Sequence, residues 1–347
     1  MSPDLAVPGP VPFQVDDAAL LTDLYEITMA ASYWREGMTG PATFSLFVRG
    51  LPPDRGYLVA AGLEDALTAL RSLHFSPAAR HYLASLGRFD AAFLEALAGI
   101  RFTGSVRAVP EGTLVFPDEP LVEVTAPILE AQLVESLVLN TIHYQTLVAT
   151  KAARCVDAAE GRSIIEFGLR RAPGLDAALK AARAAWIAGA TATSNTLAGR
   201  WLGIPVTGTM AHSYVTAFPS ELEAFRAFAR AFPADCILLI DTFDTVVGAR
   251  KAVVIGQELA ATGHRLKGVR LDSGDLLTLS RQVRHVLDEG GMTDAQIIAS
   301  GGLDEEEIDR LVRAAAPVDA FGVGTRMDVS ADAPYLDMAY KLVRYAD

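Results

Sequence analysis

His212 is the side chain best placed for chemistry in this sequence. It follows Gly208 and Thr209 in the stretch Ile204–Val215, which starts as an apolar strand and is rich in small residues. Small neighbours let a ligand approach the imidazole, which can serve as a general base, a metal ligand or a nucleophile toward phosphate. Since no HExxH or paired-histidine spacing surrounds it, the three roles stay open beside a purely structural one.

Two glycine-rich turns, Ser300–Gly302 and Gly322–Thr325, follow the last two apolar segments. Backbone N–H groups in such turns can point at an anion. Either turn alone is explained by a tight change of direction. The pair in tandem favours a phosphate site.

Charged residues follow other apolar runs. Arg170 and Arg171 end the segment Glu166–Arg171, and adjacent guanidinium groups suit a carboxylate or a phosphate. The carboxylates Asp241 and Asp244 are candidates for holding a metal or orienting the histidine, with helix capping as the alternative.

The segment Val269–Asp275 (VRLDSGD) gathers one arginine and two aspartates at one strand end. These groups suit ribose hydroxyls, a metal pyrophosphate or an aromatic ring. The alternative is that Asp272 or Ser273 only caps the helix that begins near Leu276.

Alternating strands and helices must position these residues. From residue 161 to 327 the loops are short, which predicts a parallel α/β barrel or sheet whose carboxyl strand ends carry the site. Residues 1–160 predict an α+β domain, with one helix over His81–Leu97 and short strands at 106–109, 114–116 and 121–125 resembling a β-sandwich. Residues 331–347 predict a strand that returns toward the N-terminal domain.

Composition excludes several classes of function. The chain has 347 residues and a net charge of −12, which argues against nonspecific nucleic-acid or anionic-membrane binding. Neither cysteine has a metal-binding spacing, so buried, reduced thiols are expected. No apolar run reaches the ~18 residues of a membrane helix and no signal peptide is readable, so a cytoplasmic protein is expected.

An ordered set of motifs resembles those of the nicotinate phosphoribosyltransferases. It covers Leu20–Val343 and reads LTDLYEITM, EFGLRRA, SNTLAG, GTMAHS, LIDTFDT, GVRLDSGD, SGGL and FGVGT. The resemblance implies a type II phosphoribosyltransferase fold, an irregular α/β barrel beside an N-terminal α+β domain. It implies that nicotinate and phosphoribosyl pyrophosphate give nicotinate mononucleotide and pyrophosphate in NAD biosynthesis, with Mg²⁺ as cofactor, ATP as co-substrate and a homodimer with shared active sites.

The resemblance also assigns residues. His212 matches the family's phosphohistidine, and Asp272 and Asp275 would face ribose or magnesium. The metal ligands stay open, with Asp241, Asp244 and Asp272 as the candidates. The residues assigned to nicotinate are Tyr25, which stacks on the pyridine ring across a dimer interface, Phe167 on the opposite face, Arg170, Asn195, Thr209 and Arg270. Those assigned to phosphoribosyl pyrophosphate are Arg171, Ser213, Gly301, Gly302, Gly324 and Thr325.

Asn195 bears on substrate choice. In the related nicotinamide enzymes this position resembles an Asp, whose charge would repel a carboxylate. Asn195 is uncharged and therefore favours nicotinate over nicotinamide. Asn195→Asp should then shift the substrate preference toward nicotinamide. The chain departs from the family where it ends at Asp347. Most members continue with a basic segment, so a short form or a truncated chain is expected, with stability of the N-terminal domain in question.

Alternatives remain. A nicotinamide or quinolinate phosphoribosyltransferase is the nearest, and a catalytically inactive phosphate-binding homologue belongs to another class. Without the resemblance, the residues predict only a phosphate-binding barrel enzyme such as an aldolase or isomerase. The lack of a strand-end lysine suited to a Schiff base argues against the aldolase.

Overall fold

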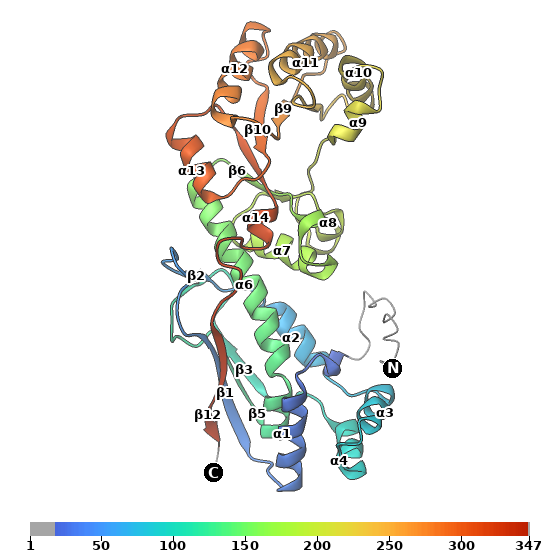
Figure 1. Ribbon diagram of the computed structural model, residues 1–347, viewed down its shortest axis with the longest axis vertical. Coiled ribbons are helices and arrows are strands. Elements are labelled where there is room, and N and C mark those ends of the chain that lie inside the picture. Colours follow the sequence, from blue (N-terminus) through green and yellow to red (C-terminus); the bar gives the residue numbers. More distant parts are fainter. Residues whose placement is uncertain (1–17, 346–347) are drawn as a thin grey trace, which may run out of the picture. The chain divides into compact units, whose positions relative to one another are not determined.

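The computed structural model describes residues 18–345, which divide into two compact units (Figure 1). Unit 1 ends at Tyr144 and resumes at Leu336, and unit 2 is Gln145–Tyr335. The division lies inside helix α6 (Glu135–Ala158), not at the predicted residue 160. An unbroken helical pattern carries no sign of where the tertiary contacts divide.

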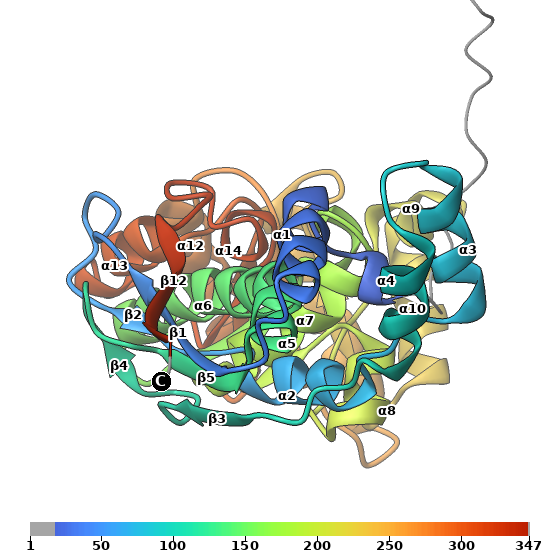
Figure 2. The same ribbon diagram turned by 90° about the horizontal axis from the view of Figure 1, so that it is seen from below.

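Unit 1 is built on an antiparallel sheet with the strand order β12-β1-β5-β3 (Figure 2). Its strands are β1 (Pro41–Val48), β3 (Ser105–Ala108), β5 (Val122–Pro127) and β12 (Met338–Tyr345). Strand β12 pairs with β1 along its whole length, and the ring of Tyr340 stacks on Phe44 with centroids 4.8 Å apart. Burial alternates along β5, as it does when one face of a sheet meets the core.

Helices and a small second sheet complete unit 1. The helical elements are η1 (Ala18–Leu20), α1 (Leu24–Arg35), α2 (Leu63–Ser72), α3 (Pro77–Ser85), α4 (Ala91–Ala96), η2 (Leu97–Gly99) and α5 (Ile128–Leu133). The single helix predicted over His81–Leu97 is wrong, because the chain turns at Gly87 with φ 64°. The predicted strand at 114–116 is β4 (Leu114–Val115), which pairs with β2 (Leu58–Val59) and not with β3 or β5.

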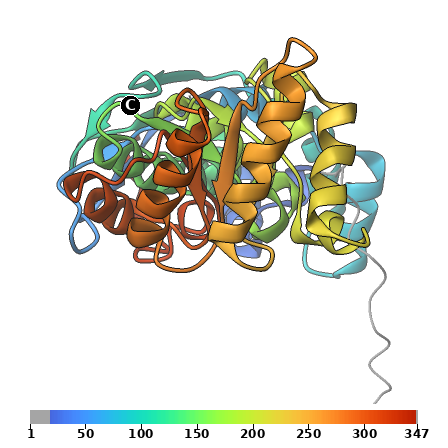
Figure 3. The same ribbon diagram turned by 90° about the horizontal axis from the view of Figure 1, so that it is seen from above.

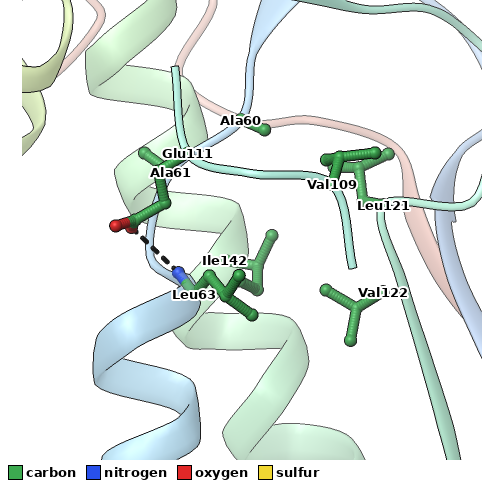
Figure 4. A pocket seen from close by; sticks show the side chains of 8 residues that line it. All are labelled: Ala60, Ala61, Leu63, Val109, Glu111, Leu121, Val122 and Ile142. Atoms are coloured by element: carbon green, nitrogen blue, oxygen red, sulfur yellow. Dashed lines mark hydrogen bonds between the residues drawn. The ribbon is translucent and has the colours of Figure 1, made fainter. Parts of the chain in front are cut away.

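Glu111 ties the turn before β4 to the start of α2. One carboxylate oxygen accepts from the N–H groups of Gly62 and Leu63, at 2.6 and 3.0 Å (Figure 4). These are the unpaired donors at a helix N-terminus, so the side chain takes the place of a local cap.

Unit 2 holds a six-stranded parallel sheet with the order β7-β6-β11-β10-β9-β8. Its strands are β6 (Ser163–Glu166), β7 (Ala192–Thr193), β8 (Ile237–Leu239), β9 (Gly268–Leu271), β10 (Gln296–Ser300) and β11 (Ala320–Val323). The sheet curls into a half-barrel, and within the described residues β7 and β8 do not pair with each other. The predicted mixed α/β fold with a barrel-like parallel sheet and a separate antiparallel domain is thus confirmed.

Helices follow the strands of unit 2, and α10, α11 and α12 lie side by side (Figures 1 and 3). They are η3 (Leu169–Arg171), α7 (Leu175–Ile187), α8 (Thr196–Leu202), α9 (His212–Thr216), α10 (Glu221–Ala231), α11 (Thr245–Ala260), α12 (Leu276–Glu289), α13 (Glu305–Arg313) and α14 (Thr325–Asp328). No helix in residues 18–345 is both long and apolar enough to cross a membrane.

The core of unit 2 lies between sheet and helices. Leu238, Val269, Ile297 and Phe321, on the four neighbouring strands β8 to β11, are fully buried, as expected for parallel strands covered by helices. Both cysteines are free and buried, as predicted. Burial raises the pKa of each thiol to about 12, so both are inert at neutral pH.

The strand predicted to begin at Ile204 is reduced to a single bridge between Val206 and Thr193. Pro205 has no N–H to donate, which prevents a longer ladder with β7. The stretch therefore reaches Gly208 as extended chain and becomes helical only at His212, the first residue of α9.

Candidate active site

A cavity of about 580 Å³ opens at the carboxyl ends of the unit 2 strands, and we call it the strand-end cavity. Every residue of its wall belongs to unit 2. The wall is formed by Phe167, Arg170, Arg171, Ser194, Gly208, Thr209, Met210, Ala211, His212, Ser213, Arg270, Asp272, Ser300, Gly301, Gly302, Gly322, Gly324 and Thr325.

Most of the residues predicted from sequence meet in this wall. They come from five separate segments, which a parallel sheet brings together because its strands end at one edge. Ser194, Met210 and Ala211 were not predicted. Ser194 directly follows β7, so a polar residue after a strand would have been the signal, whereas Met210 and Ala211 carried none.

Arg270 presents a desolvated cation to the cavity. A terminal nitrogen donates to Thr209 Oγ1 at 3.0 Å, and the guanidinium carbon lies 5.9 Å from the centre of the Phe167 ring. Its Nε is buried without a hydrogen-bond partner. Burial lowers the pKa of Arg270 and the nearby Asp272 opposes this, so the group stays charged and ready for an anion.

Asp272 is fixed from three sides. Its Oδ1 accepts from Ser300 Oγ at 2.6 Å and lies 3.5 Å from a nitrogen of Arg270. Its backbone N–H donates to Asp241 Oδ2 at 2.9 Å. The carboxylate therefore stands in the wall at a fixed place.

His212 stands beside this carboxylate. Its Nε2 lies 3.8 Å from Asp272 Oδ2, and its Nδ1 lies 3.1 Å from Thr242 Oγ1. The side chain is 43% exposed. The imidazole is thus oriented by contacts on both ring nitrogens yet remains open to a ligand.

Asp241 lies behind the wall. Its Oδ2 accepts from Ser273 Oγ at 2.6 Å as well as from the backbone of Asp272, and its buried Oδ1 has no hydrogen-bond partner. A buried carboxylate oxygen in this state calls for a cation or a donor.

Asp244 and Asp275 do not line the cavity. Asp244 accepts from Val247 N at 2.8 Å and caps α11, and Asp275 accepts from Leu277 N at 3.3 Å and caps α12. The expected pairing of Asp241 with Asp244, and the placing of Asp275 toward ribose, are not what the geometry shows. Helix capping, the alternative, accounts for both side chains.

Asn195 is also absent from the wall. It is buried, its Oδ1 accepts from the N–H groups of Leu197 and Ala198, and its Nδ2 donates to Ala178 O at 3.4 Å. These contacts cap α8 and leave the amide facing the protein interior. Asn195 therefore has no direct contact with the strand-end cavity through which it could select between nicotinate and nicotinamide.

Tyr25 belongs to unit 1, whereas the residues of the cavity wall belong to unit 2. It lies on α1, is 46% exposed and donates its hydroxyl hydrogen to Glu135 at 2.8 Å. Burial, with the contact to Glu135, raises the pKa of Tyr25, so its ring stays neutral.

The glycine turns permit close backbone approaches. Gly301 has φ 90°, and a Cβ there would lie 1.9 Å from the carbonyl oxygen of Asp272. A Cβ on Gly324 would lie 2.9 Å from the carbonyl oxygen of Phe167. In both turns, therefore, the backbone packs directly against other backbone at the carboxyl ends of the strands.

Two family models match the chain. The nicotinate phosphoribosyltransferase N-terminal domain matches residues 20–143, and the nicotinate phosphoribosyltransferase family matches residues 163–344. The chain belongs to the nicotinate phosphoribosyltransferase family. This membership confirms the resemblance drawn from the motifs.

Relatives in the nicotinate phosphoribosyltransferase family cover nearly the whole chain. Nicotinate phosphoribosyltransferase pncB2 of Mycobacterium tuberculosis is 54% identical over 94% of this chain and 70% of its own length. The Bacillus subtilis enzyme of the same name is 46% identical over 95% and 68%. The crystal structure of human nicotinic acid phosphoribosyltransferase has a TM-score of 0.85, with 34% identity over 93% of this chain and 74% of that one.

Proposed function

We propose that this protein joins nicotinate to phosphoribosyl pyrophosphate, giving nicotinate mononucleotide and pyrophosphate. The observation that carries the proposal is Arg270, a buried guanidinium on the cavity wall beside the Phe167 ring. A flat, anionic pyridine needs such a pair, because the cation binds its carboxylate and the aromatic face stacks on its ring.

The rest of the wall suits the phosphoribosyl group. Arg171, Ser213 and Thr325 offer donors, and Gly302, where an added Cβ would meet no atom within 4 Å, leaves room for phosphate oxygens. The three arginines of the wall, Arg170, Arg171 and Arg270, attract an anion locally despite the chain's net charge of −12.

Transfer breaks the bond from ribose C1 to pyrophosphate oxygen and forms the bond from C1 to the pyridine nitrogen. Positive charge develops on the ribose in between. The fixed carboxylate of Asp272 stabilises that charge, and the contacts of Arg270 hold the pyridine in line for attack.

Magnesium is part of the proposal. The unpartnered Oδ1 of Asp241 and the carboxylate of Asp272 fit a hard cation that takes its other ligands from water and phosphate. No group of three or more histidine, cysteine or acidic side chains in the described residues forms a cage. Bound there, magnesium would neutralise the charge of pyrophosphate.

We further propose that the reaction is coupled to ATP hydrolysis through His212. A nitrogen of His212 attacks the γ-phosphorus of ATP, ADP leaves, and water later takes the phosphate from the imidazole. The exposure of His212 on the wall and its contact with Thr242 support this role.

The test is a product assay by mass spectrometry with nicotinate, nicotinamide and quinolinate as competing acceptors, each with and without ATP. We expect nicotinate mononucleotide, and we expect His212→Asn to lose ATP stimulation while retaining some basal synthesis. His264→Asn, at an exposed histidine outside the wall, is the matched control. If only nicotinamide or quinolinate gave product, nicotinate would not be the substrate. If ATP stimulated His212→Asn normally, His212 would not be the residue that is phosphorylated.

We also propose a homodimer in which Tyr25 reaches the cavity of the second copy. The exposure of its side chain supports this. Mixing Tyr25→Ala chains with His212→Asn chains should restore part of the ATP-stimulated activity that neither variant has alone, because one site in each mixed dimer is intact. No recovery from a verified mixed dimer would rule out shared sites.

A further inference from the structure

The ring of Phe167 occupies the place where Gly322 would otherwise carry a side chain. A Cβ added to Gly322 would lie 2.5 Å from Phe167 Cδ2 and 2.7 Å from Phe167 Cε2. Carbon atoms that are not bonded to each other pack at about 3.5–4.0 Å. The ring therefore lies directly against the backbone of Gly322. Both residues line the strand-end cavity, and the chemistry proposed above gives Gly322 no part.

Space, and not backbone conformation, requires glycine at position 322. Gly322 belongs to strand β11, where it pairs with Ser300 on β10 and with Ile165 on β6. Its φ is not positive, in contrast to Gly301 and Gly302 of the neighbouring turn. Since any L-residue can adopt an ordinary strand conformation, the strand alone would accept alanine at this position. The ring of Phe167 is what excludes it.

Other contacts keep the ring of Phe167 where it is. The backbone N–H of Phe167 donates to Val323 O at 2.7 Å, which joins the residue to β11. The guanidinium carbon of Arg270 lies 5.9 Å from the centre of the ring. The ring also packs against a cluster of buried residues from β6, β8, β10 and β11, which are Ile165, Ile237, Ile298 and Ala320. A side chain at position 322 would therefore displace a ring that is held from several sides.

A side chain on Gly322 would also approach the residue that supports Asp272. The added Cβ would lie 3.2 Å from Ser300 Cβ, and Ser300 Oγ donates to Asp272 Oδ1 at 2.6 Å. The approach to Ser300 is less close than the approach to the two ring carbons. We therefore expect a methyl group at position 322 to act chiefly on Phe167.

We propose that Gly322 is a positioning residue for nicotinate, because its missing side chain sets the place of the Phe167 ring beside Arg270. A larger residue would displace the ring from β11 and change its distance from Arg270 and from the pyridine that stacks on it. The effect on nicotinate rests on the function proposed above, whereas the contact between the ring and Gly322 does not.

The first experiment is a double-mutant cycle measured by thermal unfolding without ligand. Gly322→Ala should lower Tm by roughly 2–12 °C when Phe167 is present. The same substitution should lower Tm by less than half as much in the Phe167→Ala variant, where the ring is gone. Phe167 is only partly buried, so we expect Phe167→Ala to fold.

Gly324→Ala is the matched control for this cycle. Its Cβ would lie 2.9 Å from the carbonyl oxygen of Phe167, an atom that Phe167→Ala keeps. Its effect on Tm should therefore be the same with and without the ring. An equal effect of Gly322→Ala with and without the ring would overturn the proposal. If Gly322→Ala does not fold, recovery of folding in the double variant supports the proposal, and failure of both variants to fold overturns it.

The second experiment measures turnover with each substrate varied in turn. Gly322→Ala should raise KM for nicotinate about 10- to 100-fold and leave KM for phosphoribosyl pyrophosphate within about threefold of wild type. In the Phe167→Ala variant, the same substitution should change KM for nicotinate by less than about threefold. A general loss of structure would not raise one KM and spare the other.

Equal rises in both KM values, or the same rise for nicotinate with and without the ring, would overturn the role of Gly322 in nicotinate binding. If wild type makes no nicotinate mononucleotide, the proposed function fails. The unfolding experiment then still decides whether Gly322 sets the place of the ring.

Discussion

Gly301→Ala should be one of the most damaging methyl additions in unit 2. Gly301 has φ 90°, and an added Cβ would meet the carbonyl oxygen of Asp272 at 1.9 Å. Gly302 is its matched control, because it has φ 69° and a Cβ there would meet no atom within 4 Å. The two variants share the backbone strain and differ only in the close approach.

The magnitude follows from this difference. Left-handed backbone costs an L-residue roughly 1–2 kcal/mol, which both variants incur. Displacing the Asp272 backbone adds about 1–3 kcal/mol in Gly301→Ala alone. For a unit of this size each kcal/mol lowers Tm by roughly 2–4 °C, so Gly301→Ala should melt roughly 2–12 °C below Gly302→Ala.

The assay is thermal unfolding of both variants without ligand, so that a methyl group blocking phosphate at Gly302 does not enter the comparison. Activity is then measured on folded Gly301→Ala, where movement of Asp272 should lower kcat/KM about 10- to 100-fold. Equal melting temperatures for the two variants would show that Gly301 does not approach the Asp272 carbonyl and would refute the reasoning.

Two further predictions follow from buried polar groups. Asn195→Asp should leave the choice between nicotinate and nicotinamide unchanged. It should lower the free energy of unfolding by about 1–3 kcal/mol, because a carboxylate oxygen replaces the amide donor to Ala178 O. A shift in selectivity in competition assays would show instead that Asn195 selects the substrate, as the sequence predicted. The raised pKa of Asp328 means that the native state holds a proton which the unfolded state gives up near pH 4. From there up to the native pKa stability should fall as pH rises, by about 1.4 kcal/mol per pH unit, and urea midpoints of Asp328→Asn should lack this slope.

Sequence patterns placed the wall residues well for a physical reason. An apolar run followed by glycine, arginine or serine marks the carboxyl end of a strand, and a parallel sheet gathers all such ends at one edge. Arg270, His212 and the turn at Gly301 were found in this way.

The same pattern could not separate wall residues from helix caps. Asp275 and Asn195 also follow strands, but each is the residue just before a helix and bonds to its first N–H groups. Capping and ligand binding favour the same short polar side chains, so only the side-chain direction decides between them.

Contacts between distant segments left less trace in the sequence. Asp328 and Glu166 lie near each other although most of unit 2 separates them in the sequence. Only the position of Glu166 directly after the apolar pair Ile164–Ile165 indicated a buried charge. The two-residue strand β4 pairs with β2. Tertiary packing determines this pairing, and the composition of so short a strand does not predict it.

The strand order of unit 2 also has a consequence for folding of the chain during its synthesis on the ribosome. Strand β6 is the first of its sheet to be made, yet β11, the last, pairs with it from Ser163↔Ala320 to Glu166↔Val323. At ribosomal rates of about 5–20 residues per second, roughly 8–30 s separate the two strands. Throughout that interval one edge of an apolar strand has no native neighbour, which is the state in which strands join the wrong partner. The nascent chain is therefore most prone to aggregation in the interval before β11 is made.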